Sequence, residues 1–382
     1  MATTTRTREF AGRRWRRWSR VTAVIGALAW VSPAPAQPPQ QPLYKAGSTS
    51  RRVTPGRGYN WRGAKTTQLL TQVWYPTTSI SAAPAQWLGP PESPWFHLGD
   101  WFEDAPAASG RFPLVLLSHG TGGSAAMLGW LAQSLAQHGY IVAAVNHPGN
   151  NALEPYTIDG FLLWWERARD VSAVIDFLLT DRDFSRRIDP SRIGAAGFSL
   201  GGYTVLVLAG ARTDPQLLRT YCRGRAVGIC ADPAEFPGLY ARWDELEKTS
   251  PAFRQASSRA GAAYRDPRIR AVFALAPAVV PALVPDGLRR VSTPVALAVG
   301  QADAVADYAS NAQLIADQIR GVASSVLAGA GHYTFLAACT VSGSASRSDL
   351  CSDGVGVDRR SVHDKTAQLA IEFFGRALTA AR

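Results

Sequence analysis

The chain has 382 residues, of which 46% are hydrophobic and 18% are charged. This composition supplies enough apolar side chains for a sizeable core and excludes wholesale disorder. The formal net charge is +11, but residues 1–36 contain seven arginines and one glutamate, so they contribute +6 and leave +5 for the remainder. The basic excess is therefore no argument for a nucleic-acid partner.

Residues 1–36 have the order of a secretory signal peptide. Basic residues end at Arg20, an apolar stretch covers Val21–Val31, and small residues around Ala36 provide a cleavage pattern. Because a transmembrane helix needs about 20 apolar residues, we predict no membrane span after cleavage, with an uncleaved anchor as the alternative. Paired arginines between positions 13 and 17 leave the general and twin-arginine export routes open. We predict an exported protein, either periplasmic or extracellular.

The four cysteines agree with export, because disulfides persist in oxidising compartments. Pairing of sequence neighbours would join Cys222 to Cys230 and Cys339 to Cys351, although four cysteines allow three pairings. A zinc site is the alternative, but these spacings are not those of a zinc knuckle and no histidine interleaves with them. We predict two disulfides and no metal.

The predicted elements along the chain alternate between strands and helices. Residues 37–66 are rich in Pro, Gln, Ser and Arg and are expected to form a flexible leader before a domain over residues 67–382. Short apolar runs predict strands, and apolar residues at steps of three and four predict helices. The predicted strands cover 67–75, 114–118, 141–146, 192–196, 269–276, 295–299 and 324–327. The predicted helices cover 125–137, 164–178, 201–208, 310–320 and 361–377.

This alternation predicts an α/β fold, a mostly parallel central sheet with helices on both faces. The stretch at 212–265 interrupts the pattern because it is polar, contains proline and is locally helical. We predict that it forms an inserted helical cap that roofs the pocket. A second irregular stretch, residues 87–102, is rich in aromatic residues and is expected to pack as a loop on the sheet edge. The alternative is an apolar rim for an acyl or aromatic group, or a surface that touches lipid.

One serine has the surroundings of a nucleophile. Ser199 lies within Gly197-Phe198-Ser199-Leu200-Gly201, between a predicted strand and a predicted helix. A nucleophile on such a tight turn needs small residues two positions away on either side, because the turn brings these backbones close together. The helix that follows directs its N-terminal amides at developing negative charge. We predict Ser199 as a catalytic nucleophile.

A serine hydroxyl needs a base to remove its proton and a carboxylate to orient that base. In this strand–turn–helix arrangement the acid and then the histidine follow the serine along the chain. His332 lies in a glycine-rich loop after a predicted strand, whereas His363 is expected on the solvated face of the last helix. Asp303 directly follows another strand, whereas Asp307 is expected to open a helix. We predict a triad of Ser199, Asp303 and His332.

The same arrangement needs two donors for the oxyanion that forms during acyl transfer. The backbone N–H of Leu200, directly after the serine, is the first predicted donor. The second should come from the glycine-rich loop after the strand at 114–118, where Thr121 is the predicted donor and Gly122 the alternative. His119 in that loop is predicted to fix the loop by hydrogen bonds rather than to take part in catalysis.

Several of these motifs resemble those of the α/β-hydrolase superfamily. They include SHGTGG at 118–123, VWYP at 73–76, GFSLGG at 197–202 and GAGH at 329–332. More narrowly, they resemble bacterial proteins described as predicted dienelactone hydrolases and the related platelet-activating-factor acetylhydrolases. True dienelactone hydrolases use a cysteine nucleophile, so Ser199 departs from that pattern. The resemblance implies the α/β-hydrolase fold and hydrolysis of carboxylic esters without a metal or organic cofactor.

The sequence therefore predicts an exported serine hydrolase that cleaves a small-molecule or lipid ester, with a short-chain, lipid or aromatic substrate, through an acyl-serine intermediate. An acyltransferase or a peptidase could use the same triad. A non-catalytic binding module on the same fold is an alternative of a different class, but such modules usually lack a triad member and none is missing here. No nucleic-acid partner is expected.

Overall fold

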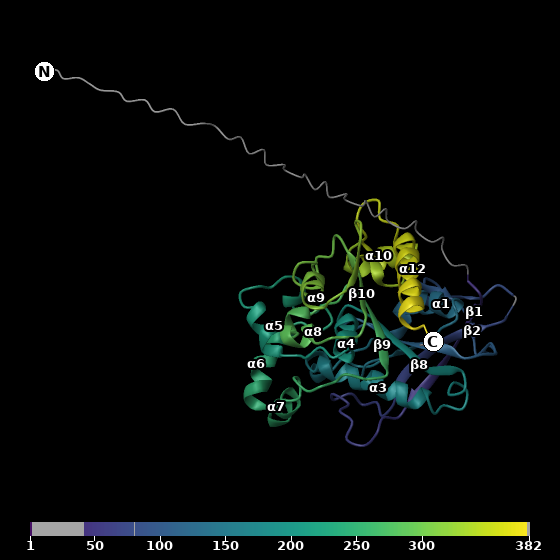
Figure 1. Cartoon of the computed structure of the whole chain (residues 1–382), viewed down its shortest axis with the longest axis horizontal. Coiled ribbons are helices and arrows are strands. Elements are labelled where there is room, and N and C mark those ends of the chain that lie inside the picture. The colour runs from purple at the N-terminus through teal and green to yellow at the C-terminus, as the bar shows by residue number, and fades with distance from the viewer. Residues whose placement is uncertain (2–41, 80, 380–382) are drawn as a thin grey trace, which may run out of the picture. The chain divides into compact units, whose positions relative to one another are not determined.

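The computed structural model describes Met1, residues 42–79 and residues 81–379 (Figure 1). The predicted signal peptide, apart from Met1, lies outside the described residues. The strands are β1 (Lys45–Val53), β2 (Leu69–Thr77), β3 (Ala85–Leu88), β4 (Phe96–Asp100), β5 (Phe102–Glu103), β6 (Phe112–Ser118), β7 (Ile141–Val145), β8 (Ile188–Phe198), β9 (Ile269–Leu275), β10 (Val295–Gly300), β11 (Ala323–Leu327) and β12 (Ala338–Cys339).

The α-helices are α1 (Gly129–Gln137), α2 (Ile158–Leu162), α3 (Arg167–Leu178), α4 (Leu200–Leu208), α5 (Pro215–Tyr221), α6 (Leu239–Thr249), α7 (Pro251–Ser257), α8 (Pro285–Arg289), α9 (Ala312–Gln318), α10 (Val341–Ser346), α11 (Ser348–Cys351) and α12 (Arg359–Ala377). The 3-10 helices are η1 (Ala125–Leu128), η2 (Trp164–Glu166), η3 (Gly228–Cys230), η4 (Val280–Ala282) and η5 (His332–Phe335).

Within the described residues, nine strands form one sheet in the order β11-β10-β9-β8-β6-β7-β2-β1-β5. The neighbours from β11 to β7 are parallel, whereas β2 pairs antiparallel with both β7 and β1. Figure 1 shows β8, β9 and β10 side by side, with α4 and α12 beside them. The sheet is mostly parallel, as the alternation of strands and helices predicts.

Helices cover both faces of this sheet. Strand β6 is buried along its whole length. Its side chains alternate between two cores: Leu114 and Leu116 pack in the core that contains α3 and α4, whereas Val115 and Leu117 pack in the core that contains α1 and α12. A strand buried on both faces needs apolar residues at every position, which explains why its sequence is a continuous apolar run.

Residues 45–53 form β1, which lies between β2 and β5 in the sheet. The prediction of a flexible leader over residues 37–66 is therefore wrong for this part. The composition was misleading because small polar residues of β1 are buried with partners. Ser48 accepts a hydrogen bond from Gln72 Nε2 at 3.1 Å, and Thr49 donates to Asp104 Oδ1 at 2.6 Å.

The aromatic-rich stretch at 87–102 is a loop only over residues 89–95. It contributes to β3 and β4, which form a three-stranded sheet with β12 among the described residues. Phe96 and Trp101 are buried in the core, whereas Trp87 is 52% exposed. Because β12 directly follows η5, this small sheet also anchors the segment that carries His332.

The stretch at 212–265 forms α5, η3, α6 and α7 between α4 and β9. A disulfide joins Cys222 at the end of α5 to Cys230 in η3. Arg219 on α5 forms ion pairs with Asp244 and Glu247 on α6. The insertion is therefore helical and is fastened internally by a covalent bond and by charge pairs.

Candidate active site

Ser199 lies on a sharp turn between β8 and α4, with φ 55° and ψ −119°. A positive φ is strained for a residue that has a side chain, and it persists only where the surroundings hold it. Gly197 and Gly201 permit the turn. A Cβ on Gly197 would lie 2.2 Å from the Gly201 carbonyl oxygen, and one on Gly201 would lie 1.9 Å from that of Ser118. The turn therefore places the Ser199 side chain at the carboxyl end of β8.

Three side chains from distant parts of the chain meet at this turn. His332 Nε2 lies 2.9 Å from Ser199 Oγ, and His332 Nδ1 lies 2.7 Å from Asp303 Oδ2. Each of the three residues is at most 7% exposed. Because a carboxylate can only accept, Nδ1 carries the proton and donates it to Asp303, which leaves Nε2 to accept from the Ser199 hydroxyl. This arrangement could remove the serine proton during a reaction.

The turn after β10 orients the Asp303 carboxylate. Its Oδ1 atom accepts hydrogen bonds from the backbone N–H groups of Val305 at 2.9 Å and Ala306 at 2.7 Å, so that Oδ2 faces His332. Asp307 instead accepts from the Ser310 N–H at 2.9 Å, before α9. Of the two aspartates, only Asp303 contacts His332.

The loop after β6 passes directly beside the serine. A Cβ on Gly120 would lie only 3.2 Å from Ser199 Cβ. The Gly122 N–H donates to Asn150 Oδ1 at 2.6 Å, whereas among the described residues no hydrogen bond takes up the N–H of Thr121. Of the two loop donors considered from the sequence, Thr121 is thus the one whose N–H is available to a ligand.

Beneath this loop lies a buried polar network that includes two of the six histidines. His147 Nδ1 lies 2.8 Å from Asp170 Oδ2, and His147 Nε2 lies 2.8 Å from Ser118 Oγ. His119 Nε2 accepts from the His147 N–H at 3.1 Å, so its Nδ1 carries a proton and donates to the Gly120 carbonyl at 2.7 Å. Burial lowers the pKa of both histidines well below the usual range, which keeps them neutral. The prediction that His119 fixes the loop is confirmed.

Two arginines complete this network. Arg62 donates to both oxygens of Asp170, at 3.1 and 2.6 Å. Arg167 donates to backbone carbonyls of the loop rather than to a carboxylate. No sequence motif indicates a role for Arg62, Arg167 or Asp170. Arg167 and Asp170 lie next to the apolar positions Ala168 and Val171 on the buried face of α3, and that place was the available signal.

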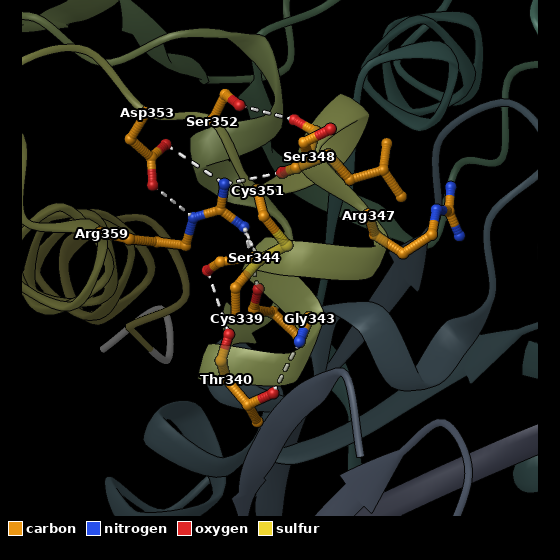
Figure 2. Close-up of a disulfide and its surroundings, with 12 residues drawn as sticks. Cys339, Thr340, Gly343, Ser344, Arg347, Ser348, Cys351, Ser352, Asp353 and Arg359 are labelled. Carbon is orange, nitrogen blue, oxygen red and sulfur yellow. Dashed lines mark hydrogen bonds and ion pairs between the residues drawn. A yellow bond between two sulfur atoms is a disulfide. The ribbon is translucent and has the colours of Figure 1, made fainter. Parts of the chain in front are cut away.

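The loop that carries His332 is supported by the segment around the second disulfide, Cys339–Cys351. Figure 2 shows Arg359 between this disulfide and Asp353. Arg359 Nε and Asp353 Oδ2 form an ion pair at 2.8 Å. Asp353 accepts a hydrogen bond from Thr334 Oγ1 at 2.7 Å, and the same hydroxyl accepts from the Gly331 N–H at 3.0 Å. A chain of contacts therefore runs from Arg359 to the residue directly before His332. Both predicted disulfide pairings are confirmed.

His363 does not lie on a solvated face, so that prediction is wrong. It is 6% exposed, stacks on Trp130 with ring centroids 4.0 Å apart, and its Nε2 donates to the Thr334 carbonyl at 2.9 Å. Burial lowers the pKa of His363 to about 4, so the ring is neutral at pH 7. Helical periodicity alone did not reveal this inward position, because the residues around His363 on α12 are mostly polar. His363 therefore supports the segment that carries His332.

Residues of the helical insertion lie close to two segments of the candidate site. A Cβ on Gly228 would lie 2.9 Å from the Val305 carbonyl oxygen, and one on Gly122 would lie 2.7 Å from Glu235 Cγ. The insertion therefore lies against both the turn that carries Asp303 and the loop beside Ser199. Burial raises the pKa of the Glu235 carboxyl above its usual range.

Within the described residues, no group of three or more His, Cys, Asp or Glu side chains could hold a metal ion, and no helix is long and apolar enough to span a membrane.

Comparison with known proteins gives three kinds of match. A model of the family "Platelet-activating factor acetylhydrolase, isoform II" matches residues 101–162. Curated relatives include cutinase est1 of Thermobifida alba, 32% identical over 111 residues, which are 28% of this chain and 34% of the relative. Cutinase cut1 of Thermobifida fusca is 31% identical over 111 residues, 28% of this chain and 32% of the relative. The chain thus matches about a third of the length of these relatives.

A solved structure extends the likeness over most of the chain. The ferulic acid esterase of Streptomyces cinnamoneus superposes with a TM-score of 0.58 and 20% sequence identity, over 88% of this chain and 91% of that chain. At this identity the likeness concerns the fold. The predicted fold class is confirmed: this chain has the α/β-hydrolase fold.

Proposed function

We propose that this chain is an exported serine hydrolase that cleaves carboxylic esters through an acyl-serine intermediate. The observation that carries the proposal is the continuous contact from Ser199 Oγ to His332 Nε2 and from His332 Nδ1 to Asp303 Oδ2, at 2.9 and 2.7 Å. It occurs on a strained strand-to-helix turn, which is the context that a serine nucleophile of this fold requires.

Each residue has a defined role in the proposed reaction. His332 accepts the proton of Ser199 as Oγ attacks the ester carbonyl carbon, and Asp303 stabilises the resulting imidazolium. The N–H groups of Thr121 and Leu200 donate to the oxyanion of the tetrahedral intermediate. His332 then passes the proton to the leaving alcohol, which departs and leaves an acyl group on Ser199. Water activated by the same histidine releases the acid.

The substrate class follows from the relatives rather than from the triad, which is common to many acyl-transfer enzymes. Cutinases and a ferulic acid esterase are among the matched proteins. We therefore extend the proposal to carboxylic esters with a short-chain, lipid or aromatic acyl group. The two disulfides support an oxidising compartment outside the cytoplasm, in agreement with the signal peptide predicted at residues 1–36.

The decisive experiment compares Ser199→Ala with the wild type on p-nitrophenyl esters of increasing acyl length. We expect the variant to lose at least about 10³-fold in kcat while its melting temperature stays unchanged. Ser324→Ala, which alters an exposed serine on β11, is the matched control and should keep full turnover. A fluorophosphonate should add to the wild type but not to Ser199→Ala, as measured by mass spectrometry. Turnover that survives in Ser199→Ala would refute the proposal.

A further inference from the structure

The loop beside Ser199 receives hydrogen bonds from a fully buried guanidinium. Arg167 is 1% exposed, and its Nη1 atom donates to the His119 carbonyl at 2.7 Å. Its Nη2 atom donates to the Gly120 carbonyl at 3.2 Å and to Asn150 Oδ1 at 3.3 Å. The same Asn150 oxygen accepts from the Gly122 N–H. One side chain therefore holds the loop before and after Thr121.

This guanidinium has no carboxylate of its own among the described residues. Asp170, the nearest acidic group along the network, already accepts from both terminal nitrogens of Arg62, from His147 Nδ1 and from the Tyr59 hydroxyl. With the histidines neutral, the network holds two guanidinium groups and one carboxylate. A positive charge therefore remains uncompensated beneath the loop. Burial, followed by repulsion from Arg62, lowers the pKa of Arg167 to about 9, so it is still charged at pH 7.

The hydrogen bond from Arg167 to the Gly120 carbonyl also affects the N–H of Thr121, the predicted oxyanion donor. The Gly120 carbonyl and the Thr121 N–H belong to the same planar peptide unit. That carbonyl accepts from both Arg167 Nη2 and His119 Nδ1. Hydrogen bonds to the oxygen of an amide polarise it and make its N–H a stronger donor, and the effect is larger in a low-dielectric interior. The orientation of the N–H is also fixed, since the plane is held from its carbonyl side.

We propose that Arg167 is a positioning residue for the oxyanion hole: it fixes the Gly120–Thr121 peptide and strengthens the Thr121 N–H toward the negative charge that develops on the substrate oxygen. The inference rests on the proposed function and adds a residue to it. Since the charge appears only in the transition state, the contribution of Arg167 should appear in kcat rather than in substrate binding.

The test uses Arg167→Met with two ketone inhibitors, one that develops an oxyanion on binding and one that does not. An alkyl trifluoromethyl ketone forms a tetrahedral oxyanion adduct with Ser199, whereas the matching unfluorinated ketone binds without one. We expect kcat on p-nitrophenyl butyrate to fall about 10- to 100-fold with little change in KM. The Ki of the trifluoromethyl ketone should rise by the same factor, and the Ki of the other ketone should change less than twofold. Arg167→Lys, which keeps the charge, should recover part of the loss.

Arg169→Met is the matched control, because Arg169 lies on the same helix and contacts Glu166 rather than the loop. It should leave kcat and both Ki values unchanged. The inference is overturned if Arg167→Met keeps the kcat and trifluoromethyl ketone affinity of the wild type. It is also overturned if both ketones weaken equally, because a loop that has merely collapsed would affect both.

Asn150→Asp decides the question if Arg167→Met does not fold. The new carboxylate keeps an acceptor for Arg167 and for the Gly122 N–H, and it neutralises the guanidinium. The variant also loses the hydrogen bond that Asn150 Nδ2 donates to the Gly160 carbonyl at 3.1 Å, so we expect a lower melting temperature. We expect a lower kcat and a selectively weakened trifluoromethyl ketone, and an unchanged kcat in the folded variant would overturn the inference. These outcomes differ from a failure of the proposed function, which would appear as turnover by Ser199→Ala. If Ser199 is essential and the Arg167 variants behave like the wild type, only the present inference fails.

Discussion

The two loops on either side of Ser199 are supported in different ways. The loop after β6 rests on a buried network in which Arg167 and Asp170 are at most 1% exposed. The segment that carries His332 is supported from the side, by a disulfide and by the ion pair between Arg359 and Asp353, whose side chains are 6% and 16% exposed. The first support lies wholly in the folded core, whereas the second includes a covalent bond near the surface. The two loops should therefore respond to different perturbations.

The largest expected effect comes from removing the carboxylate that orients His332. Asp303→Asn keeps the shape of the side chain but offers His332 no charge and allows the wrong tautomer. We expect kcat to fall about 10⁴-fold, or about 5 kcal/mol of transition-state stabilisation, measured on a soluble p-nitrophenyl ester. Asp307→Asn is the matched control and should stay within twofold of the wild type. A kcat for Asp303→Asn within tenfold of the wild type would show that another group orients the base.

The second prediction separates the covalent support from the buried one. Replacing Cys339 and Cys351 by serine should lower the free energy of unfolding by about 3 kcal/mol and reduce kcat, because Arg359 and Asp353 lose their fixed backbone. Chemical denaturation and ester kinetics measure the two effects. Replacing Cys222 and Cys230 should cost similar stability but less activity. Equal losses of kcat in the two double variants would contradict the distinction between the loops.

The third prediction concerns stability in acid. The pKa of His363 is lowered to about 4, below the value of about 6.5 expected in the unfolded chain. As the pH falls below 6.5 the unfolded chain takes up a proton that the folded state does not, so stability is lost between about pH 6.5 and 4. The loss should approach 3 kcal/mol. In His363→Gln this part of the pH dependence should disappear in urea unfolding at pH 7 and 4.5, and identical pH dependence in the two proteins would contradict it.

The smallest expected effect concerns the contacts within the segment that carries His332. Thr334→Val removes the hydroxyl that links Gly331 to Asp353 and should cost about 1 kcal/mol of stability together with a several-fold loss of kcat. Thr340→Val is the control, since its hydroxyl caps α10 by accepting from the Gly343 N–H on the other side of the disulfide. It should cost similar stability and leave kcat unchanged. Loss of kcat in both variants would mean that kcat follows overall stability.

The strands of the central sheet could be predicted where burial made the signal simple. Strands such as β6 and β10 are buried on both faces, and a continuous apolar run is the direct consequence. β1 was missed because its buried positions carry small polar residues, such as Ser48 and Thr49, whose partners are distant in the chain. The buried side of α12 could not be predicted for a related reason. His363 is a polar residue whose burial depends on stacking against Trp130, which is distant in the chain.

Local sequence by itself determined the turn at Ser199 and the candidates for acid and base, because glycine spacing and strand ends restrict the backbone over a few residues. Only the tertiary structure decided which loop N–H stays available and which charges are buried. Arg62 and Asp170 are 108 positions apart, and the sequence near either residue does not indicate that they pair. A charged side chain within a helix is most often solvated, and the cost of burying it is offset only by partners that the fold brings together. The support beneath the site is therefore a property of packing across the whole chain.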